Sequence, residues 1–298
     1  MRLLVSGGTG FIGKHLIRRL VGEGHDLSII IKPGTAAADL AGTDIFEFSG
    51  ETQALVQYTQ QHHFDGLIHL ASLFLAQHAT DQIQELMASN VLFGSQLLEA
   101  AVQNKIPWFL NTGTFWQHYQ NQEYSPVNLY AATKQALVDI AQYYTETTNL
   151  DFVTLKLSDT FGPDDVRPKV LNLFAKIGQS GETLDMSPGD QFLDISYIDN
   201  VIDAYVRLIE LLAQDKQRTL CGKSFAVKAT ERITLRQLAE IFERVTNTKL
   251  HIRWGGRGYR PREVMVPWEA GETVPGWTPK ISLEEGIQRT FDTEASHG

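Results

Sequence analysis

The chain contains very little cysteine: one residue, Cys221, among 298. One thiol cannot build a disulfide framework. This excludes the small disulfide-rich secreted scaffolds and makes a reducing compartment, the cytoplasm, the expected location. Long apolar runs are also missing, and none approaches the ~20 residues of a membrane-spanning helix. The apolar run at residues 3–5 is too short for a signal peptide. We therefore expect no membrane association.

Positive charge is scarce as well: 26 Lys and Arg stand against 35 Asp and Glu, for a net charge of −9. An acidic surface repels a phosphate backbone, so nucleic-acid binding is not expected. The 9 histidines show no spacing with cysteine or carboxylates that resembles a zinc site, so no metal site is expected. An ordinary apolar content of 43% leaves enough residues for one large domain or two intimate lobes.

The first 160 residues alternate short apolar runs with longer amphipathic ones. We expect strands at 3–6, 27–31, 45–48, 66–70, 108–112 and 152–157, and helices at 11–21, 52–61, 82–103 and 129–147. Near-continuous apolar strands that alternate with helices indicate a parallel sheet covered on both faces. Right-handed crossovers make it a doubly wound α/β sheet, a Rossmann fold.

After about residue 160 the rhythm changes, and turn-rich segments appear at 162–165 and 187–190. Helices are still expected at 200–212 and 235–245. We expect residues 161–298 to form mainly a smaller substrate-binding lobe, with some segments returning to the Rossmann core. The lobe should lie over the carboxyl edge of the sheet, where ligands bind in such folds.

A glycine-rich loop follows the first expected strand and opens the first expected helix. It reads Ser6-Gly7-Gly8-Thr9-Gly10-Phe11-Ile12-Gly13. Gly7 permits a tight turn, Gly10 lets the backbone approach a pyrophosphate, and Gly13 allows the helix to pack on the strand. The helix, which begins at Phe11 and Ile12, then points its N-terminus at the phosphates. The loop therefore predicts a dinucleotide-binding domain over residues 1–160.

The end of the second expected strand bears on the choice of cofactor. An Asp or Glu there would hold both ribose hydroxyls and favour NAD. This sequence has Lys32-Pro33-Gly34 instead. A cation suits a 2′-phosphate, so NADP(H) is favoured and NAD(H) is kept as the alternative.

Proton-transfer chemistry can be carried by a second set of residues, Thr112, Tyr130 and Lys134. Tyr130 and Lys134 lie four apart on an expected helix and share one face. A free tyrosine has a pKa near ~10, and a neighbouring ammonium is expected to lower it. The tyrosine can then exchange a proton with a carbinol oxygen, to which Thr112 can donate a hydrogen bond. With the glycine loop, this set is sufficient for hydride chemistry on a carbonyl.

These residues together resemble the extended short-chain dehydrogenase/reductase family of the NAD-dependent epimerase/dehydratase type. The similarity runs nearly end to end. The matching segments are Ser6–Gly13, His69-Leu70-Ala71, Asn90-Val91 with Gly94, Thr112–Trp116, Leu155–Pro163, Gln191–Val201 and Gly276–Gly286. The resemblance implies Thr112, Tyr130 and Lys134 as the catalytic triad. It also implies that Leu70 and Ala71 lie along the cofactor and that Asn90 supports the site.

The resemblance also directs attention to the substrate. The family acts mostly on nucleotide-activated sugars and commonly places an arginine near Arg262 on the nucleotide diphosphate, where a guanidinium fits phosphate oxygens. Arg167 is a lesser candidate for the same role. Thr114, Trp116 and His118 follow the catalytic threonine and are further candidates for contact with substrate.

Several positions depart from the family pattern. Asp159 replaces an asparagine that often touches substrate, and its carboxylate would repel a diphosphate. Leu193 replaces an arginine, and Gln117 replaces a glycine, which suggests a differently shaped sugar pocket. Within the family, residues 111–118 and 128–134 are most similar to the CDP-abequose and CDP-paratose synthases, which are NADPH-dependent 4-ketoreductases.

The leading hypothesis is thus NADPH-dependent reduction of a 4-keto nucleotide-activated deoxysugar, with Tyr130 as proton donor. One alternative is an epimerase that holds NAD tightly. Another is a non-catalytic regulator that senses the dinucleotide, although a sensor need not keep Thr112, Tyr130 and Lys134. A homodimer is expected through the helices at 82–103 and 129–147, which pair across a two-fold axis in this family.

Overall fold

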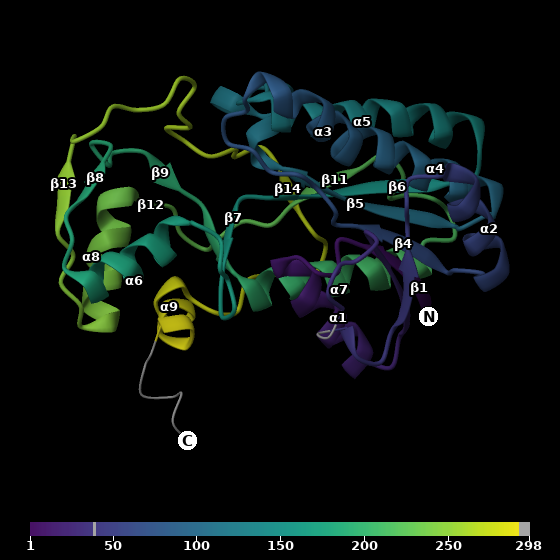
Figure 1. Ribbon diagram of the computed structural model, residues 1–298, viewed down its shortest axis with the longest axis horizontal. Helices are drawn as coiled ribbons and strands as arrows, with labels where there is room; N and C mark the ends of the chain where they lie inside the picture. The colour runs from purple at the N-terminus through teal and green to yellow at the C-terminus, as the bar shows by residue number, and fades with distance from the viewer. Residues whose placement is uncertain (38–39, 292–298) are drawn as a thin grey trace.

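The main sheet is entirely parallel. The computed structural model describes residues 1–37 and 40–291, and in this part of the chain the largest sheet has eight strands in the order β14-β11-β6-β5-β4-β1-β2-β3 (Figure 1). The strands are β1 (Arg2–Ser6), β2 (Asp26–Ile31), β3 (Asp44–Glu47), β4 (Gly66–His69), β5 (Trp108–Thr114), β6 (Asp151–Leu157), β11 (Ser224–Ala226) and β14 (Glu272–Thr273). From β1 the order runs outward to β2 and β3 on one side and to β4 and β5 on the other. This confirms the expected doubly wound α/β fold.

Helices cover both faces of this sheet. On one face lie α1 (Phe11–Gly22) and α7 (Ile198–Gln214); on the other lie α2 (Thr52–His62), α4 (Phe93–Gln103) and α5 (Leu129–Thr147) (Figure 1). Successive side chains of β1 point to opposite faces of the sheet, and both faces are apolar. Leu3 and Val5 pack into the core beneath α1 and α7, whereas Leu4 packs into the core of the opposite face.

The expected helix over residues 82–103 is interrupted in the structure. A short α3 (Ile83–Met87) passes into a π-helical turn (Ala88–Leu92) before α4 begins. The buried side chain of Asn90 lies in this turn. It accepts a hydrogen bond from the Leu73 N–H and donates one to the Thr133 hydroxyl. Such π turns often occur at functional sites.

The second lobe combines three helices with short two-stranded pairings. The helices are α6 (Val170–Ser180), α8 (Leu235–Thr246) and α9 (Leu283–Phe291). The pairs are β7 (Asp159–Phe161) with β10 (Ile195–Tyr197), β8 (Leu184–Met186) with β13 (Ile252–Trp254), and β9 (Phe192–Leu193) with β12 (Ile233–Thr234). Strands of two or three residues carry no readable periodicity, which is why the sequence pattern did not predict them.

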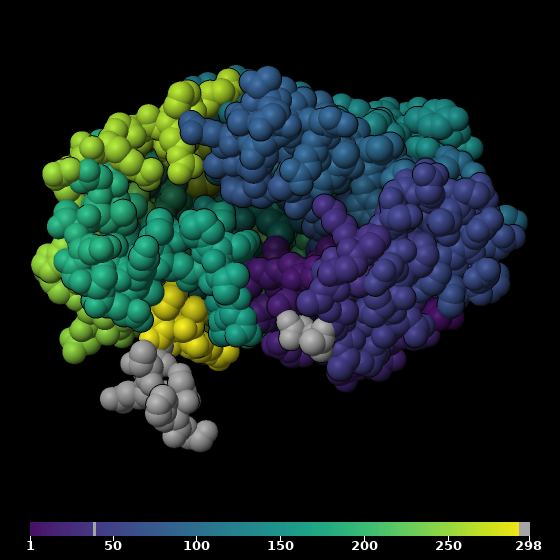
Figure 2. All heavy atoms as spheres, viewed as in Figure 1, coloured from purple at the N-terminus to yellow at the C-terminus, as the bar shows by residue number. Residues whose placement is uncertain are grey.

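The two lobes share one hydrophobic core. A single cluster includes Leu16 of α1, Tyr205 of α7, and Phe174 and Phe242 of the second lobe. The helix α7 and the strands β11 and β14 follow residue 160 in the chain but belong to the Rossmann layer. In the space-filling view the surface is hollowed between the lobes, where the carboxyl ends of the strands lie (Figure 2).

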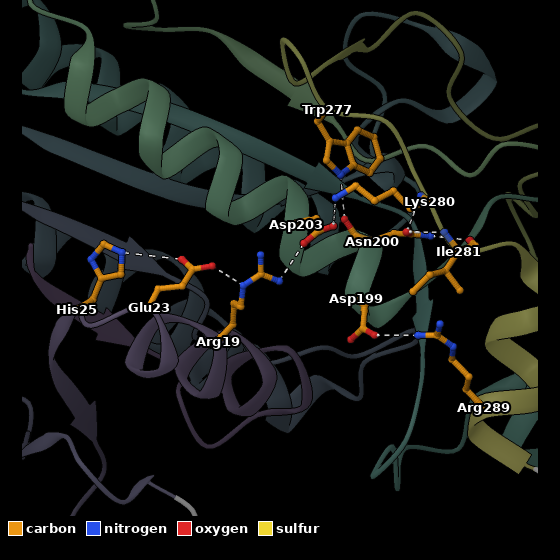
Figure 3. A network of polar contacts seen from close by, with 10 residues as sticks. All are labelled: Arg19, Glu23, His25, Asp199, Asn200, Asp203, Trp277, Lys280, Ile281 and Arg289. Atoms are coloured by element: carbon orange, nitrogen blue, oxygen red, sulfur yellow. Dashed lines mark hydrogen bonds and ion pairs between the residues drawn. The ribbon is translucent and has the colours of Figure 1, made fainter.

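A polar network ties α1, α7 and the C-terminal segment together (Figure 3). The buried Asn200 accepts hydrogen bonds from the backbone N–H groups of Lys280 and Ile281 at 2.9 and 3.0 Å and donates to the Ile281 carbonyl at 2.8 Å. Nearby, Asp203 accepts from Arg19 of α1 at 3.0 Å and from the Lys280 ammonium at 2.9 Å. The network fixes residues 277–281 against the N-terminal end of α7.

Asn200→Ala is expected to lower the free energy of unfolding by ~1 to 3 kcal/mol, because it leaves three partly buried backbone groups of residues 280–281 without their partner. Urea denaturation would measure the loss. Lys280→Ala, in the same network but with an exposed ammonium, is the matched control and should change stability by less than ~1 kcal/mol. Equal effects of the two substitutions would contradict this account of the network.

Candidate active site

The glycine-rich loop packs directly against the end of β4. Gly7 has a φ of 81°, a conformation that favours glycine, and a Cβ there would lie 2.4 Å from the backbone nitrogen of Ala71. The N–H of Leu70 donates to the Ser6 carbonyl at 3.0 Å. Leu70 and Ala71 therefore lie beside the loop, at the carboxyl edge where the sequence placed them.

The helix α1 begins with free backbone donors. Gly10 is its N-cap residue, no side chain caps the helix, and its first turn has no acidic residue. Gly13 packs so closely that a Cβ would lie 2.2 Å from the Gly7 carbonyl oxygen. The N–H groups of the first turn, which includes Phe11 and Ile12, are thus available to an anion. This arrangement fits the pyrophosphate of a dinucleotide cofactor.

Lys32 follows directly after β2 and is exposed. β2 pairs in parallel with β1, with Ile30 opposite Ser6, so Lys32 lies at the same edge of the sheet as the glycine loop. The position suits an electrostatic contact with the ribose end of a cofactor held by that loop.

Thr112 has a partner that sequence reasoning missed. Its hydroxyl lies 2.6 Å from the hydroxyl of Tyr205, a fully buried residue of α7. Burial raises the pKa of Tyr205, so its phenol stays protonated. When Tyr205 donates this hydrogen bond, the Thr112 proton is free to be donated onward. Only the α7 periodicity marks Tyr205 in the sequence, and that pattern indicates burial rather than chemistry.

Negative charge on Tyr130 would further raise the pKa of Tyr205, so the two phenols are electrostatically coupled. Burial raises the pKa of Tyr130 itself to about 12, partly offset by a hydrogen bond with Ser72. The expectation that Lys134 lowers this pKa is therefore wrong for the free protein, because desolvation of the phenolate outweighs other effects. The tyrosine is a neutral phenol, the form that a proton donor requires.

Lys134 is 2% exposed, and burial lowers its pKa to about 8. It lies near His69, whose pKa falls to about 3 through burial and then through the charge of this lysine. His69 stays neutral, with its Nδ1 2.7 Å from the Ser6 hydroxyl. The His69 side chain is fully buried.

Asn90 connects the loop after β4 to helix α5. Its Oδ1 accepts from the Leu73 N–H at 2.7 Å, and its Nδ2 donates to the Leu73 carbonyl and to the Thr133 hydroxyl, each at 3.0 Å. The Thr133 hydroxyl in turn donates to the carbonyl of Tyr130 at 2.7 Å. Asn90 thus holds the backbone of Leu73 and, through the Thr133 hydroxyl, is linked to the carbonyl of Tyr130.

Phe74 extends from this loop beside Tyr130. Its ring meets Tyr130 edge-on at 5.0 Å and lies 5.4 Å from the ring of Trp116. The ring is 45% exposed although the loop around it is held by hydrogen bonds, including two from Asn128 to the carbonyls of residues 75 and 76. Phe74 therefore connects the tyrosine to the cavity that Trp116 lines.

A cavity between the lobes brings together Trp116 and Arg262. The exposed Arg262 donates to the Ser125 hydroxyl at 2.7 Å, and its guanidinium lies 4.1 Å from the ring centroid of Tyr119. Thr114 is buried, and its hydroxyl accepts a hydrogen bond from the backbone N–H of Trp116 at 3.2 Å. Thr114 is thus positioned to orient Trp116.

Asp159 and Leu193, two of the three departures from the family pattern, line the same cavity. Asp159 accepts from the Lys169 ammonium at 2.7 Å, so a cation offsets the charge that would repel a phosphate. Arg167 lies elsewhere: Asp165 binds its guanidinium through both carboxylate oxygens, and the group lies 4.4 Å from the ring centroid of Phe11. Arg167 is therefore beside the glycine loop rather than with Arg262.

His118 is not brought together with Trp116 and Arg262. It lines a second cavity with Lys156 and Trp268. Its Nδ1 lies 3.0 Å from the Gln122 carbonyl, and its ring stacks on Trp268 at 3.9 Å. Its proximity to Trp116 in the sequence suggested a shared pocket, but the chain turns between residues 115 and 121, which separates their side chains.

Within residues 1–37 and 40–291, no group of three or more His, Cys, Asp or Glu side chains is arranged to hold a metal ion. No helix among these residues is long and apolar enough to cross a bilayer.

Comparison with known proteins places these features in context. The model of the NAD dependent epimerase/dehydratase family matches residues 3–221. A CDP-abequose synthase of Salmonella muenchen is 25% identical over 292 residues, covering 97% of this chain and 96% of the relative. A UDP-glucose 4-epimerase of Halalkalibacterium halodurans is 23% identical, covering 100% of this chain and 96% of the relative.

Solved structures agree on the fold. A UDP-glucose 4-epimerase of Thermotoga maritima with UDP-glucose superposes with a TM-score of 0.84 at 19% identity, covering 99% of each chain. A UDP-glucuronic acid 4-epimerase of Bacillus cereus in complex with UDP-glucuronic acid and NAD gives a TM-score of 0.84 at 20% identity, covering 98% of each chain. At these identities, the likeness establishes the architecture.

Proposed function

This chain belongs to the NAD-dependent epimerase/dehydratase family, and on that premise we propose that it reduces the keto group of a 4-keto nucleotide-activated deoxysugar with NADPH. The observation that carries the proposal is the hydrogen-bonded hydroxyl pair of Thr112 and Tyr205 near the carboxyl edge of the sheet, coupled electrostatically to the Tyr130 phenol, whose pKa burial raises. A ketone reductase needs a proton donor and a hydrogen-bond donor for one oxygen, and this cluster has both.

In the proposed mechanism the glycine-rich loop and the first turn of α1 would hold a dinucleotide whose nicotinamide would supply the hydride for the carbonyl carbon. Tyr130 gives its phenolic proton to the carbonyl oxygen. Thr112 donates a hydrogen bond to that oxygen while Tyr205 donates to Thr112, which orients the threonine proton. As the proton leaves Tyr130, the Lys134 ammonium offsets the charge that develops on the phenolate.

For substrate binding we propose the cavity between the lobes. Trp116 offers a ring face to the sugar, Thr114 orients it, and Arg262 supplies a cation for the diphosphate. For the cofactor we propose the loop containing Gly7, Gly10 and Gly13, together with Phe11, Ile12, Lys32, Leu70, Ala71, Asn90, Tyr130 and Lys134. Arg167 belongs with this second group, because it lies against Phe11.

The test separates reduction from epimerisation. A reductase must exchange its cofactor at each turnover, whereas an epimerase regenerates it and gains from holding it tightly. The purified protein is expected to carry little nicotinamide and to consume one NADPH per 4-keto nucleotide sugar, with CDP-linked substrates tested first. Tightly bound NAD, with sugar interconversion and no net cofactor consumption, would favour an epimerase, the activity named for several of the solved neighbours. Absence of both activities with intact dinucleotide binding would favour a non-catalytic regulator.

Lys32 is expected to set the cofactor preference. We predict that NADP(H) binds more tightly than NAD(H) and that Lys32→Asp erases or reverses the preference by repelling the 2′-phosphate and favouring the free ribose hydroxyls. Titration of each cofactor by fluorescence or calorimetry gives the ratio of Kd values. Lys223→Asp, a charge change at an exposed turn before β11, is the control and should leave the ratio unchanged. Equal Kd values in the wild type would remove the basis for this role.

We also propose a homodimer through α3, α4 and α5. Large exposed apolar side chains lie along this face: Ile83 and Met87 on α3, Leu92 in the π-helical turn before α4, and Tyr143 on α5. Apolar groups of this kind on neighbouring helices are typical of protein interfaces. Light scattering at micromolar concentration should give twice the chain mass, and a monomer would contradict the proposal.

A further inference from the structure

A second cavity contains a buried amine that the proposed reaction does not use. Lys156, near the end of β6, is 7% exposed and lines this cavity, whose volume is about 700 Å³. Room for the lysine stem comes from Gly113 on the neighbouring strand, because a Cβ there would lie 2.8 Å from the Lys156 Cγ. The side chain is therefore built into the fold.

The partner of this amine is a neutral imidazole. The His118 Nδ1 faces the Gln122 carbonyl at 3.0 Å, which assigns the ring proton to that nitrogen and leaves the Nε2 lone pair for Lys156 at 2.8 Å. Burial and the lysine charge lower the pKa of His118 to about 4. Stacking on Trp268 at 3.9 Å and an interplanar angle of 8° holds the ring in place.

No carboxylate pairs with Lys156 in the described part of the chain, where its neighbours are His118 and the ring of Trp268, 5.1 Å from the ammonium. A buried ammonium without a counter-ion is costly, and burial accordingly lowers the pKa of Lys156 to about 8. An amine in such surroundings is partly unprotonated near neutral pH and becomes a nucleophile, as in lysines that form Schiff bases.

We propose that Lys156 is a covalent binding site for small neutral aldehydes, which it captures as an imine in the second cavity. The lining of the cavity sets the ligand class. Glu123 and Glu272 stand at its surface and disfavour an anionic aldehyde, while Gln122 and Ser224 offer partners for hydroxyl groups. A short hydroxylated aldehyde such as glyceraldehyde matches this lining.

The covalent step balances without an oxidant or reductant. The unprotonated fraction of the Lys156 amine uses its lone pair to form a C–N bond to the aldehyde carbon as the C=O π pair moves to oxygen. Both protons of the amine nitrogen then reach that oxygen, which leaves as water as the C=N bond forms. The products are one imine and one water.

The experiment labels the intact wild-type protein with glyceraldehyde at pH 7.5, traps imines with cyanoborohydride, and quantifies each modified lysine by peptide mass spectrometry. NADP⁺ is present to shield Lys134, the other buried lysine with a lowered pKa. Lys249, whose side chain is 78% exposed, is the internal reference. Lys156 is expected to react at least ~10-fold faster than Lys249, because a much larger fraction of its amine is unprotonated.

Two further measurements complete the test. Lys156→Arg keeps the cation and the long stem but should abolish this label while the other sites react as before. Glyoxylate, an anionic aldehyde, should label Lys156 more slowly than glyceraldehyde does. Labelling of Lys156 no faster than Lys249 would overturn the proposal, and faster labelling by glyoxylate would overturn the assignment of a neutral ligand.

Discussion

Replacing Tyr130 with phenylalanine is expected to lower kcat by ~10²- to 10⁴-fold while leaving cofactor affinity nearly unchanged. The substitution keeps the ring that packs edge-on against Phe74 and deletes the hydroxyl that supplies the proton. Burial raises the pKa of Tyr130 to about 12, so the wild-type residue stays protonated across the working range of pH. Deleting the Tyr130 hydroxyl therefore removes the proton donor at every pH and should not move the pH optimum of the remaining activity.

Steady-state kinetics with NADPH and a 4-keto nucleotide sugar measure the loss, and cofactor titration checks binding. Tyr143→Phe, on the same helix but 64% exposed, is the matched control and should retain wild-type kcat. Tyr205→Phe should give an intermediate loss, since it removes the hydroxyl that orients Thr112 and leaves the donor in place. A Tyr130→Phe variant with near wild-type kcat would eliminate this residue as the acid.

Lys134→Met is expected to lower kcat/KM by ~10²-fold or more, because it removes the ammonium that offsets the developing phenolate and that can hold the cofactor ribose. The structure adds a signature in pH. Burial lowers the pKa of Lys134 to about 8, and the protonated form is the active one. Wild-type kcat/KM, which reports the free protein, should therefore fall as pH rises through about 8.

The variant provides the control for this assignment. In Lys134→Met the decline of kcat/KM above pH 8 should disappear, since methionine does not titrate, and the remaining activity should be flat over the same range. Thermal unfolding would verify that the variant is folded. A wild-type profile that stays level to pH 10, or a decline that persists in the variant, would assign the titration to another group.

The parts of this protein that the sequence determined are those set by local pattern. Apolar runs alternating with amphipathic helices predicted every strand from β1 to β6, within about two residues of each boundary, because burial on both faces of a parallel sheet leaves a readable signal. The glycine-rich loop was also predictable from the sequence, since Gly7 and Gly13 stand where a Cβ would clash with neighbouring backbone. Helical spacing also predicted that Tyr130 and Lys134 lie on one helix, α5, while their catalytic role stays a prediction.

What only the tertiary structure decided depends on residues that meet from distant parts of the chain. Tyr205 reaches Thr112 across 93 positions, and Phe74 meets Tyr130 because Asn90 and Asn128 hold its loop; neither contact has a local signature. The direction of the Tyr130 pKa was also beyond sequence reasoning, because helical spacing indicates that a lysine is near but not how much water is excluded. His118 shows the same limit. It stands two positions after Trp116, which lines the cavity between the lobes, but its side chain lines the second cavity. The desolvation of a group and the direction of its side chain depend on three-dimensional packing, so local sequence patterns do not predict them.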